Sequence, residues 1–223
     1  MTIIGPTRII KCPHCFALVS HFTLLSGNTG GATVWTDGYV DYPMFPRSPY
    51  ITKCHNCAGY YWRADAEEIG ELPFRGEERK PVLGQDPDWA NAPRIKELDE
   101  DEYWAALASG TASTTKEEKF LRILAWWRSN DPYRDHPDPA EITRSSDSIL
   151  NLERLIELLS DSDEPRDMLF NAEVFRQLGR FDESIAVLEL ISATEVRATR
   201  DQITQLASEN WSGLARLEDI GSE

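Results

Sequence analysis

Short runs of β-branched and aromatic residues, separated by turn-forming residues, fill the first quarter of the chain. Such residues favour strands, and alternation of apolar and polar positions is typical of a strand with one buried face. The runs predict strands at 7–11, 16–25, 33–36, 39–42, 50–53 and 59–63. Asp37 and Gly38 separate two of these runs, which is a strong signal for a tight hairpin. The sequence therefore predicts a small β domain over residues 1–64.

Apolar residues take a helical spacing after residue 98. They recur at intervals of three and four, as at Leu121 and Leu124. Asp99, and Thr115 with Glu118 three residues later, are typical of helix N-termini. Helices are expected at 99–107, from 115 to just before 130, at 145–159, at 166–178, at 183–191 and at 194–217. Residues 99–223 are therefore predicted to form a helical domain, and the fold class is α+β.

Residues 65–98, between these two regions, are rich in proline and in acidic side chains. A short helical turn is expected at 64–69. Because Phe74, Val82, Leu83 and Trp89 would otherwise be exposed, the segment is predicted to be an ordered but irregular connector.

All four cysteines of the chain fall in two Cys-x-x-Cys pairs. The first pair is Cys12 and Cys15, and the second is Cys54 and Cys57. Each such turn lets two sulfurs converge on one ion, and two turns complete a tetrahedron. Zinc with four thiolates has no open position for water or substrate, so we expect structural Zn²⁺ bound by these four residues.

The order of strands, hairpin and cysteine pairs resembles a zinc ribbon over the first 64 residues. The resemblance implies that the ion supplies much of the folding energy of a small domain. Ribbon knuckles often have Gly directly after the second Cys, where the turn needs a positive φ. Phe16 and Ala58 stand there in this chain. Lys11 and Lys53 precede the two pairs and could offset the negative charge of the thiolates.

A redox interpretation of the first pair is also open. Cys12-Pro13-His14-Cys15 has the residue types of the active-site motif in the thiol oxidase branch of the thioredoxin family. Too little chain precedes the motif for the strands of that fold. The segment after it has the composition of a strand, and the second pair would have no role. A thiol–disulfide oxidoreductase is therefore the third hypothesis.

The net charge of −15 is unevenly distributed. Residues 1–63 have five basic and two acidic residues, whereas residues 99–223 have 13 basic and 27 acidic. Nucleic acid is thus an improbable partner of the helical domain and a conceivable one of the β domain. No apolar run is long enough to span a membrane, and no signal peptide is evident at the N-terminus. A cytoplasmic location with reduced cysteines is expected.

One predicted helix pair resembles a tetratricopeptide repeat near residues 165–198. The matching residues are Ala172, Phe175, Leu178-Gly179-Arg180-Phe181-Asp182-Glu183-Ser184-Ile185 and Leu188. Met168 and Val196 depart from the family pattern, and no second copy matches as well at that period. The resemblance implies recognition of a protein or peptide, with Leu169, Glu173, Arg176 and Gln177 on the binding face. The alternative is that the helix pair only packs against its neighbours.

No phosphate loop, nucleophile elbow or metalloprotease motif occurs, and His21 and His136 have no carboxylate or nucleophile at a catalytic spacing. The leading hypothesis is a non-catalytic adaptor, in which zinc fixes the β domain and the helical domain binds a protein partner. The second hypothesis is a zinc-ribbon protein associated with nucleic acid, with an acidic regulatory helical domain.

Overall fold

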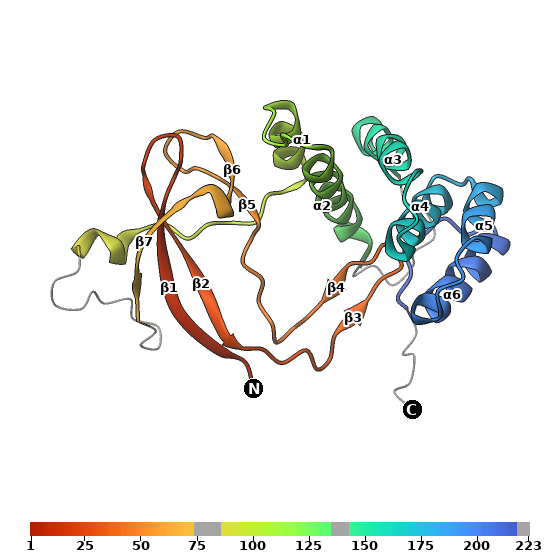
Figure 1. The fold of residues 1–223 in the computed structure, drawn as a ribbon, viewed down its shortest axis with the longest axis horizontal. Coiled ribbons are helices and arrows are strands. Elements are labelled where there is room, and N and C mark those ends of the chain that lie inside the picture. The colour runs from red at the N-terminus through yellow and green to blue at the C-terminus, as the bar shows by residue number, and fades with distance from the viewer. Residues whose placement is uncertain (74–85, 135–142, 218–223) are drawn as a thin grey trace. The chain divides into compact units, whose positions relative to one another are not determined.

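The computed structural model describes residues 1–73, 86–134 and 143–217 and divides the chain into two compact units. Unit 1 comprises residues 1–32 and 42–111, and unit 2 comprises residues 33–41 and 112–223. Small antiparallel sheets near the N-terminus and helices in the C-terminal part confirm the α+β class (Figure 1). The domain boundaries after residues 64 and 98 stay predictions. The contacts group residues 33–41 with the helices.

Unit 1 is built on a three-stranded antiparallel sheet in the order β2-β1-β7 (Figure 1). The strands are β1 (Ile3–Lys11), β2 (Leu18–Ser26) and β7 (Glu67–Leu72). The register of β1 against β2 shifts between Ile4 and Thr7. Pro6, which has no N–H to donate to the ladder, lies within this shift. Ile9 and Leu72, both fully buried, belong to one core cluster of unit 1.

Strand β7 corrects the predicted helical turn at 64–69. A 3-10 turn, η1 (Arg63–Asp65), comes first, and the chain then enters the sheet. Glutamates are poor strand formers, but those of β7 face cations of β1. The Nζ of Lys11 lies 3.2 Å from Oε2 of Glu67, and the guanidinium of Arg8 pairs with Glu68. The strand is held by its backbone pairing with β1 and by the burial of Leu72, and the exposed charge pairs add to this. A propensity scale contains none of these contacts.

The rest of unit 1 is made of short elements. They are the antiparallel pair β5 (Ile51–Lys53) and β6 (Tyr60–Trp62), the 3-10 helix η2 (Pro87–Asn91) and α1 (Glu100–Ala108). The expected anchor Trp89 packs with the core cluster of the sheet. Its ring lies so close to Gly70 that a Cβ there would be 2.2 Å from it. The other expected anchors, Phe74, Val82 and Leu83, lie outside the described residues.

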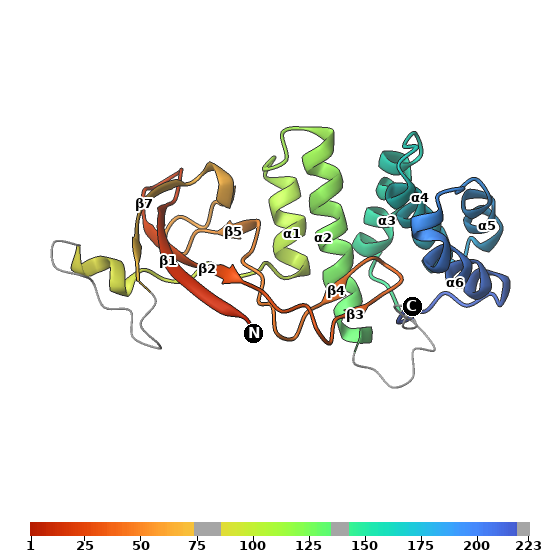
Figure 2. The ribbon, with the colours of Figure 1, turned by 60° about the horizontal axis from the view of Figure 1, so that its bottom comes forward.

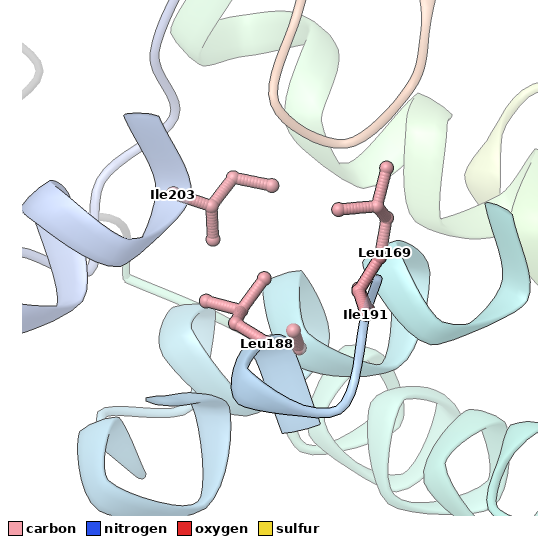
Figure 3. Close-up of a cluster of buried hydrophobic side chains, with 5 residues drawn as sticks. Leu169, Leu188, Ile191 and Ile203 are labelled. Carbon is pink, nitrogen blue, oxygen red and sulfur yellow. The ribbon is translucent and has the colours of Figure 1, made fainter. Parts of the chain in front are cut away.

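The helices of unit 2 pack in sequence order, each against the next (Figure 2). They are α2 (Thr115–Arg134), α3 (Ser146–Leu159), α4 (Pro165–Gln177), α5 (Phe181–Glu189) and α6 (Arg197–Ser208), with a 3-10 turn η3 (Thr194–Val196) before the last. Leu169, Leu188, Ile191 and Ile203 meet in the core cluster shown in Figure 3. Ala172 and Ser184, the two small residues of the predicted helix pair, are both fully buried.

Two predicted C-terminal helix ends differ from the structure by more than two residues. Helix α2 continues through Pro132 to Arg134, although it was expected to end before residue 130. The last helix was expected to reach residue 217 but ends at Ser208. Asn210 takes a positive φ of 54° and closes the helix. His136 lies outside the described residues. No helix in the described part of the chain has the length and apolarity needed to span a bilayer.

The hairpin of β3 (Thr33–Val34) and β4 (Val40–Asp41) belongs to unit 2. The prediction of a turn at Asp37-Gly38 is confirmed, with a positive φ of 75° at Gly38. The segment after α6 pairs with this hairpin. The N–H of Thr36 donates to the carbonyl of Ala215 at 2.9 Å, and the N–H of Leu217 donates to that of Val34 at 2.8 Å. Residues far apart in sequence thus form one small β layer.

Candidate metal centre

The four cysteines come together in unit 1, with all their Sγ atoms within 4.8 Å of one another. Two sulfur–sulfur contacts join the two pairs. Cys12 Sγ lies 3.8 Å from Cys57 Sγ, and Cys15 Sγ lies 3.6 Å from Cys54 Sγ. Zinc–thiolate bonds of about 2.3 Å place the sulfurs of a tetrahedron about 3.8 Å apart. The spacing and the donor set therefore fit one four-coordinate metal ion, while the identity of the metal remains a prediction.

The two cysteine turns have the same backbone geometry. In each turn the residue after the second cysteine donates its N–H to the carbonyl of the first. Phe16 donates to Cys12 at 2.9 Å, and Ala58 donates to Cys54 at 3.0 Å. Both donors have a positive φ, 62° and 59°. The left-handed backbone expected of a zinc knuckle is thus present, although neither position is glycine. Each non-glycine residue there costs about 1–2 kcal/mol.

Hydrogen bonds to the sulfurs prepare the site for a cation. The backbone N–H of His14 points at Cys12 Sγ at 3.4 Å, and that of Asn56 at Cys54 Sγ at 3.4 Å. The side chain of Asn56 also donates to Cys15 Sγ at 3.5 Å. Such donors stabilise thiolates and orient them toward an ion. Asn56 was missed by the sequence analysis, because no pattern distinguishes it from a solvated turn residue.

The surroundings shift the pKa values of the thiols in opposite directions. Burial raises the pKa of Cys12 to about 12. The hydrogen bond from the Asn56 side chain lowers the pKa of Cys15 to about 6. A metal must displace the proton of a thiol such as Cys12, so metal affinity should fall in acid. Burial also raises the pKa of Tyr61, which packs against Cys12 and Cys54.

The lysines that precede the cysteine pairs make contacts of their own. Lys11 pairs with Glu67, and Lys53 Nζ lies 3.1 Å from Glu102 Oε1. Their charges are therefore met by carboxylates of unit 1. The backbone N–H donors to the sulfurs give a more direct account of how the thiolate charge is stabilised.

The four residues proposed for partner binding are buried in unit 2. Leu169 is part of its apolar core, and Glu173 and Arg176 are 0% exposed. The guanidinium of Arg176 donates to both Glu173 oxygens, at 2.8 and 2.6 Å, and to the carbonyl of Gly213 at 2.8 Å. Gln177 donates to Glu173 Oε1 at 2.7 Å. The segment after α6 thus covers Arg176, whereas Leu169 packs with Leu188, Ile191 and Ile203, and Gln177 accepts from the Trp126 indole of α2 at 2.9 Å. A partner could reach these side chains only if that segment and the packed helices moved.

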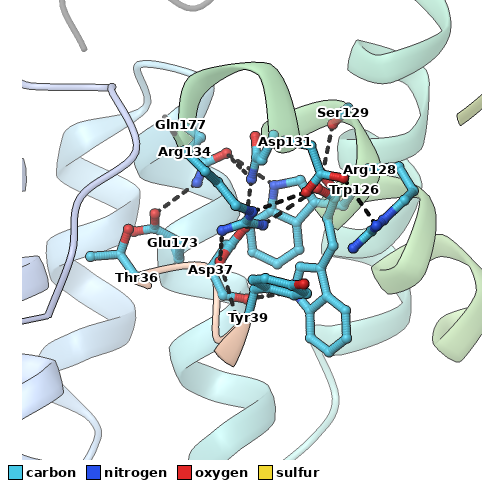
Figure 4. Close-up of polar contacts among 12 residues, drawn as sticks. Thr36, Asp37, Tyr39, Trp126, Arg128, Ser129, Asp131, Arg134, Glu173 and Gln177 are labelled. Carbon is cyan, nitrogen blue, oxygen red and sulfur yellow. Dashed lines mark hydrogen bonds and ion pairs between the residues drawn. The ribbon is translucent and has the colours of Figure 1, made fainter. Parts of the chain in front are cut away.

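The same region holds a buried ion pair that was not predicted (Figure 4). Asp37 of the hairpin is 0% exposed, and its Oδ2 accepts from Arg134 Nη2 at 2.6 Å. Asn130 Nδ2 donates to the same oxygen at 2.8 Å, and the N–H of Tyr39 donates to Oδ1 at 3.0 Å. The indole of Trp127 donates to the Asp37 carbonyl at 2.9 Å. These contacts fasten the hairpin to α2 and explain why it belongs to unit 2.

The comparisons with known proteins add no relative: no family model, no curated protein and no solved structure matches this chain.

Proposed function

We propose that this protein is a non-catalytic interaction adaptor in which four thiolates hold a structural zinc ion. The convergence of four sulfurs on one point carries the proposal. A four-thiolate shell is full, so it stabilises a fold and leaves no coordination position for a substrate. The small hydrophobic clusters of unit 1 make such a stabiliser useful, because small domains bury little apolar surface.

The metal part of the proposal is tested by stoichiometry and folding. Native mass spectrometry of the full chain should show one Zn²⁺ per molecule. The Cys12→Ser variant should lose the ion and lose protease resistance in unit 1, because metal binding and folding are coupled. His55→Ala is the matched control, since His55 is exposed and lies inside the second cysteine turn. A metal-free chain, or full zinc retention by Cys12→Ser, would contradict the proposal.

The partner-binding part needs an accessible surface, because the four residues first proposed are buried. The start of α3 offers one: Ile149 is 42% exposed and Leu150 is 66% exposed. Adjacent exposed apolar side chains on a helix are more typical of a contact surface than a single one is. We therefore place the partner contact of the helical unit there.

Affinity capture from the native host with quantitative mass spectrometry tests this surface. A protein captured by the wild type and by His55→Ala should be lost with Leu150→Asp, while the helical circular dichroism stays unchanged. Leu190→Asp is the matched control in unit 2, since Leu190 is 72% exposed and lies at the end of α5, outside the proposed surface. Equal capture by all of these variants would rule out the surface.

The two other hypotheses receive less support from the geometry. Arg8, Lys11 and Lys53 each pair with a glutamate, which lowers the charge that unit 1 could offer a phosphate backbone. For the redox hypothesis, sulfur contacts of 3.8 and 3.6 Å join the two pairs, so Cys12 and Cys15 do not form a separate dithiol site. Salt-sensitive binding of a 20-nucleotide single strand by the full chain would promote the nucleic-acid hypothesis.

A further inference from the structure

A groove of about 310 Å³ lies in unit 1 beside the middle of β2. Phe22, Thr23 and Leu24 line one side, and the segment from Phe45 to Tyr50 lines part of the rest. Side chains of a strand alternate between its two faces, so three consecutive lining residues mean that the groove borders the strand's backbone edge. The groove is therefore placed where an added strand would lie.

The pairing of the sheet shows which backbone groups face this edge. Ser20 donates its N–H to the carbonyl of Pro93 at 2.8 Å and accepts from the N–H of Ile95 at 2.9 Å, both on the outer side of β2. Backbone groups of an antiparallel strand alternate in direction, so those of Phe22 also point outward.

The free edge of β2 is paired at Ser20 by a short segment of the same chain, and β2 extends beyond that segment. Residues 93–95 run parallel to β2 at Ser20, and the chain then leaves, with Lys96 accepting from the Thr52 hydroxyl. The imidazole of His21 lies 3.1 Å from the Phe22 carbonyl, whereas the Phe22 N–H has no acceptor among the described residues. The Phe22 N–H on this edge could therefore pair with an added strand.

The chemistry of the groove is unlike the rest of this acidic chain. Phe22, Leu24, Phe45 and Tyr50 give it apolar walls, and Tyr50 is 57% exposed. Two arginines, Arg47 and Arg63, line it, and no acidic residue does so in the described part of the chain. The Ser48 hydroxyl is buried there without a hydrogen-bond partner among the described residues. An anionic group between apolar ones would complement such a lining.

We propose that this groove binds an extended peptide of a partner protein, which adds a strand to β2 beyond residue 22. The peptide carries an acidic side chain between apolar ones. Backbone hydrogen bonds to the edge give affinity, the apolar walls take alternate side chains, and Arg47 and Arg63 meet the carboxylate. The proposal concerns unit 1 alone and does not depend on the surface at α3.

Display selection tests it, with the zinc-loaded full chain immobilised against random nonapeptides. The enriched sequences should carry Asp or Glu flanked by apolar residues. A dye-labelled synthetic peptide with the leading sequence should bind about tenfold more weakly when its Asp or Glu is replaced by Asn or Gln. The unchanged peptide should lose a similar amount of affinity for the Arg47→Glu protein. Lys116→Glu, an equal charge change at an exposed site outside the groove, should leave binding unchanged. The amide peptide needs no change in the protein, so it stays informative if an arginine variant misfolds.

N-methylation of the same peptide tests the strand addition itself. Methyl groups on alternate backbone nitrogens should abolish binding, and those between them should be tolerated, because only every second N–H of a strand faces its neighbour. Three results of the peptide experiments would overturn the proposal. They are the absence of any enriched peptide, enrichment without an acidic residue, and an N-methyl profile without a period of two. Concentration-dependent dimerisation blocked by Arg47→Glu would instead assign the groove to a second copy and also overturn it.

Discussion

The buried Asp37 should control the stability of unit 2, although it lies far from the helices in sequence. In Asp37→Ala, Arg134 loses its two contacts with the carboxylate, at 2.6 and 3.3 Å. Asn130 and the N–H of Tyr39 lose an acceptor as well. Removing one partner of a buried ion pair costs about 3–5 kcal/mol. Arg134 keeps a bond to Asp131 at 3.1 Å, so we expect a loss near the lower limit, about 3 kcal/mol.

Urea unfolding followed by helical circular dichroism measures this loss. With an m value of about 2 kcal/mol per molar, a loss of about 3 kcal/mol lowers the midpoint by about 1.5 M. Asp41→Ala is the matched control, since Asp41 is an exposed carboxylate of the same hairpin. It should change stability by less than about 0.5 kcal/mol.

A double variant separates the charge effect from loss of side-chain volume. Arg134→Met in the Asp37→Ala background removes the stranded cation, so it should recover part of the lost stability. A midpoint for Asp37→Ala equal to that of Asp41→Ala would refute the assignment of the hairpin to unit 2. Failure of Arg134→Met to recover any stability would refute the electrostatic cause.

Three further predictions follow from the same contacts. Ala58→Gly should stabilise zinc-loaded unit 1 by up to about 1 kcal/mol in thermal melts by relieving the positive φ, whereas Ala64→Gly, at a position of ordinary φ, should destabilise it. Burial lowers the pKa of His21 below its usual 6.5, so the unfolded chain protonates first as the pH falls and stability is lost below about pH 6.5. His21→Gln should flatten that slope in urea titrations at about pH 5 and pH 7.5, and an unchanged slope would count against it. Residues 112–223 alone should fail to unfold cooperatively, and linking residues 33–41 to them through a Gly-Ser segment should restore a sharp transition.

The cluster of four cysteines was predictable because its signal is local. Two turns with fixed internal spacing bring sulfurs together in almost any surrounding fold, so Cys12, Cys15, Cys54 and Cys57 could be grouped without a topology. The helices of unit 2 were predictable for a similar reason, because apolar spacing and capping residues act within a few turns. The ends of these helices were harder to predict. Asn210 ends α6, although the apolar spacing in the sequence continues to residue 217.

The parts that were missed depend on contacts between distant residues. Strand β7 forms by pairing with β1, where its glutamates also face Arg8 and Lys11. The burial of Arg176 depends on carbonyls of the segment after α6. A repeat pattern assigns residues to helix faces but does not show what covers them. Arg176 was therefore expected on a binding face, although the same chain already occupies that face.

The position of the hairpin in the sequence links the metal centre to the helical unit. Residues 33–41 lie within the 38 residues that separate Cys15 from Cys54. An ion held by both cysteine pairs would close this loop, and seating of Asp37 fixes its middle in unit 2. Ion binding and the seating of Asp37 each restrict the same stretch of chain, so each lowers the entropy that the other must remove. The free energies of the two events are therefore coupled, and the coupling is reciprocal. The closure cost changes by only about 0.6 kcal/mol for each doubling of loop length, so the coupling should be of the order of 1 kcal/mol. The cysteines would then do more than close unit 1, because loss of the ion would weaken the hold on the hairpin without breaking any contact of Asp37.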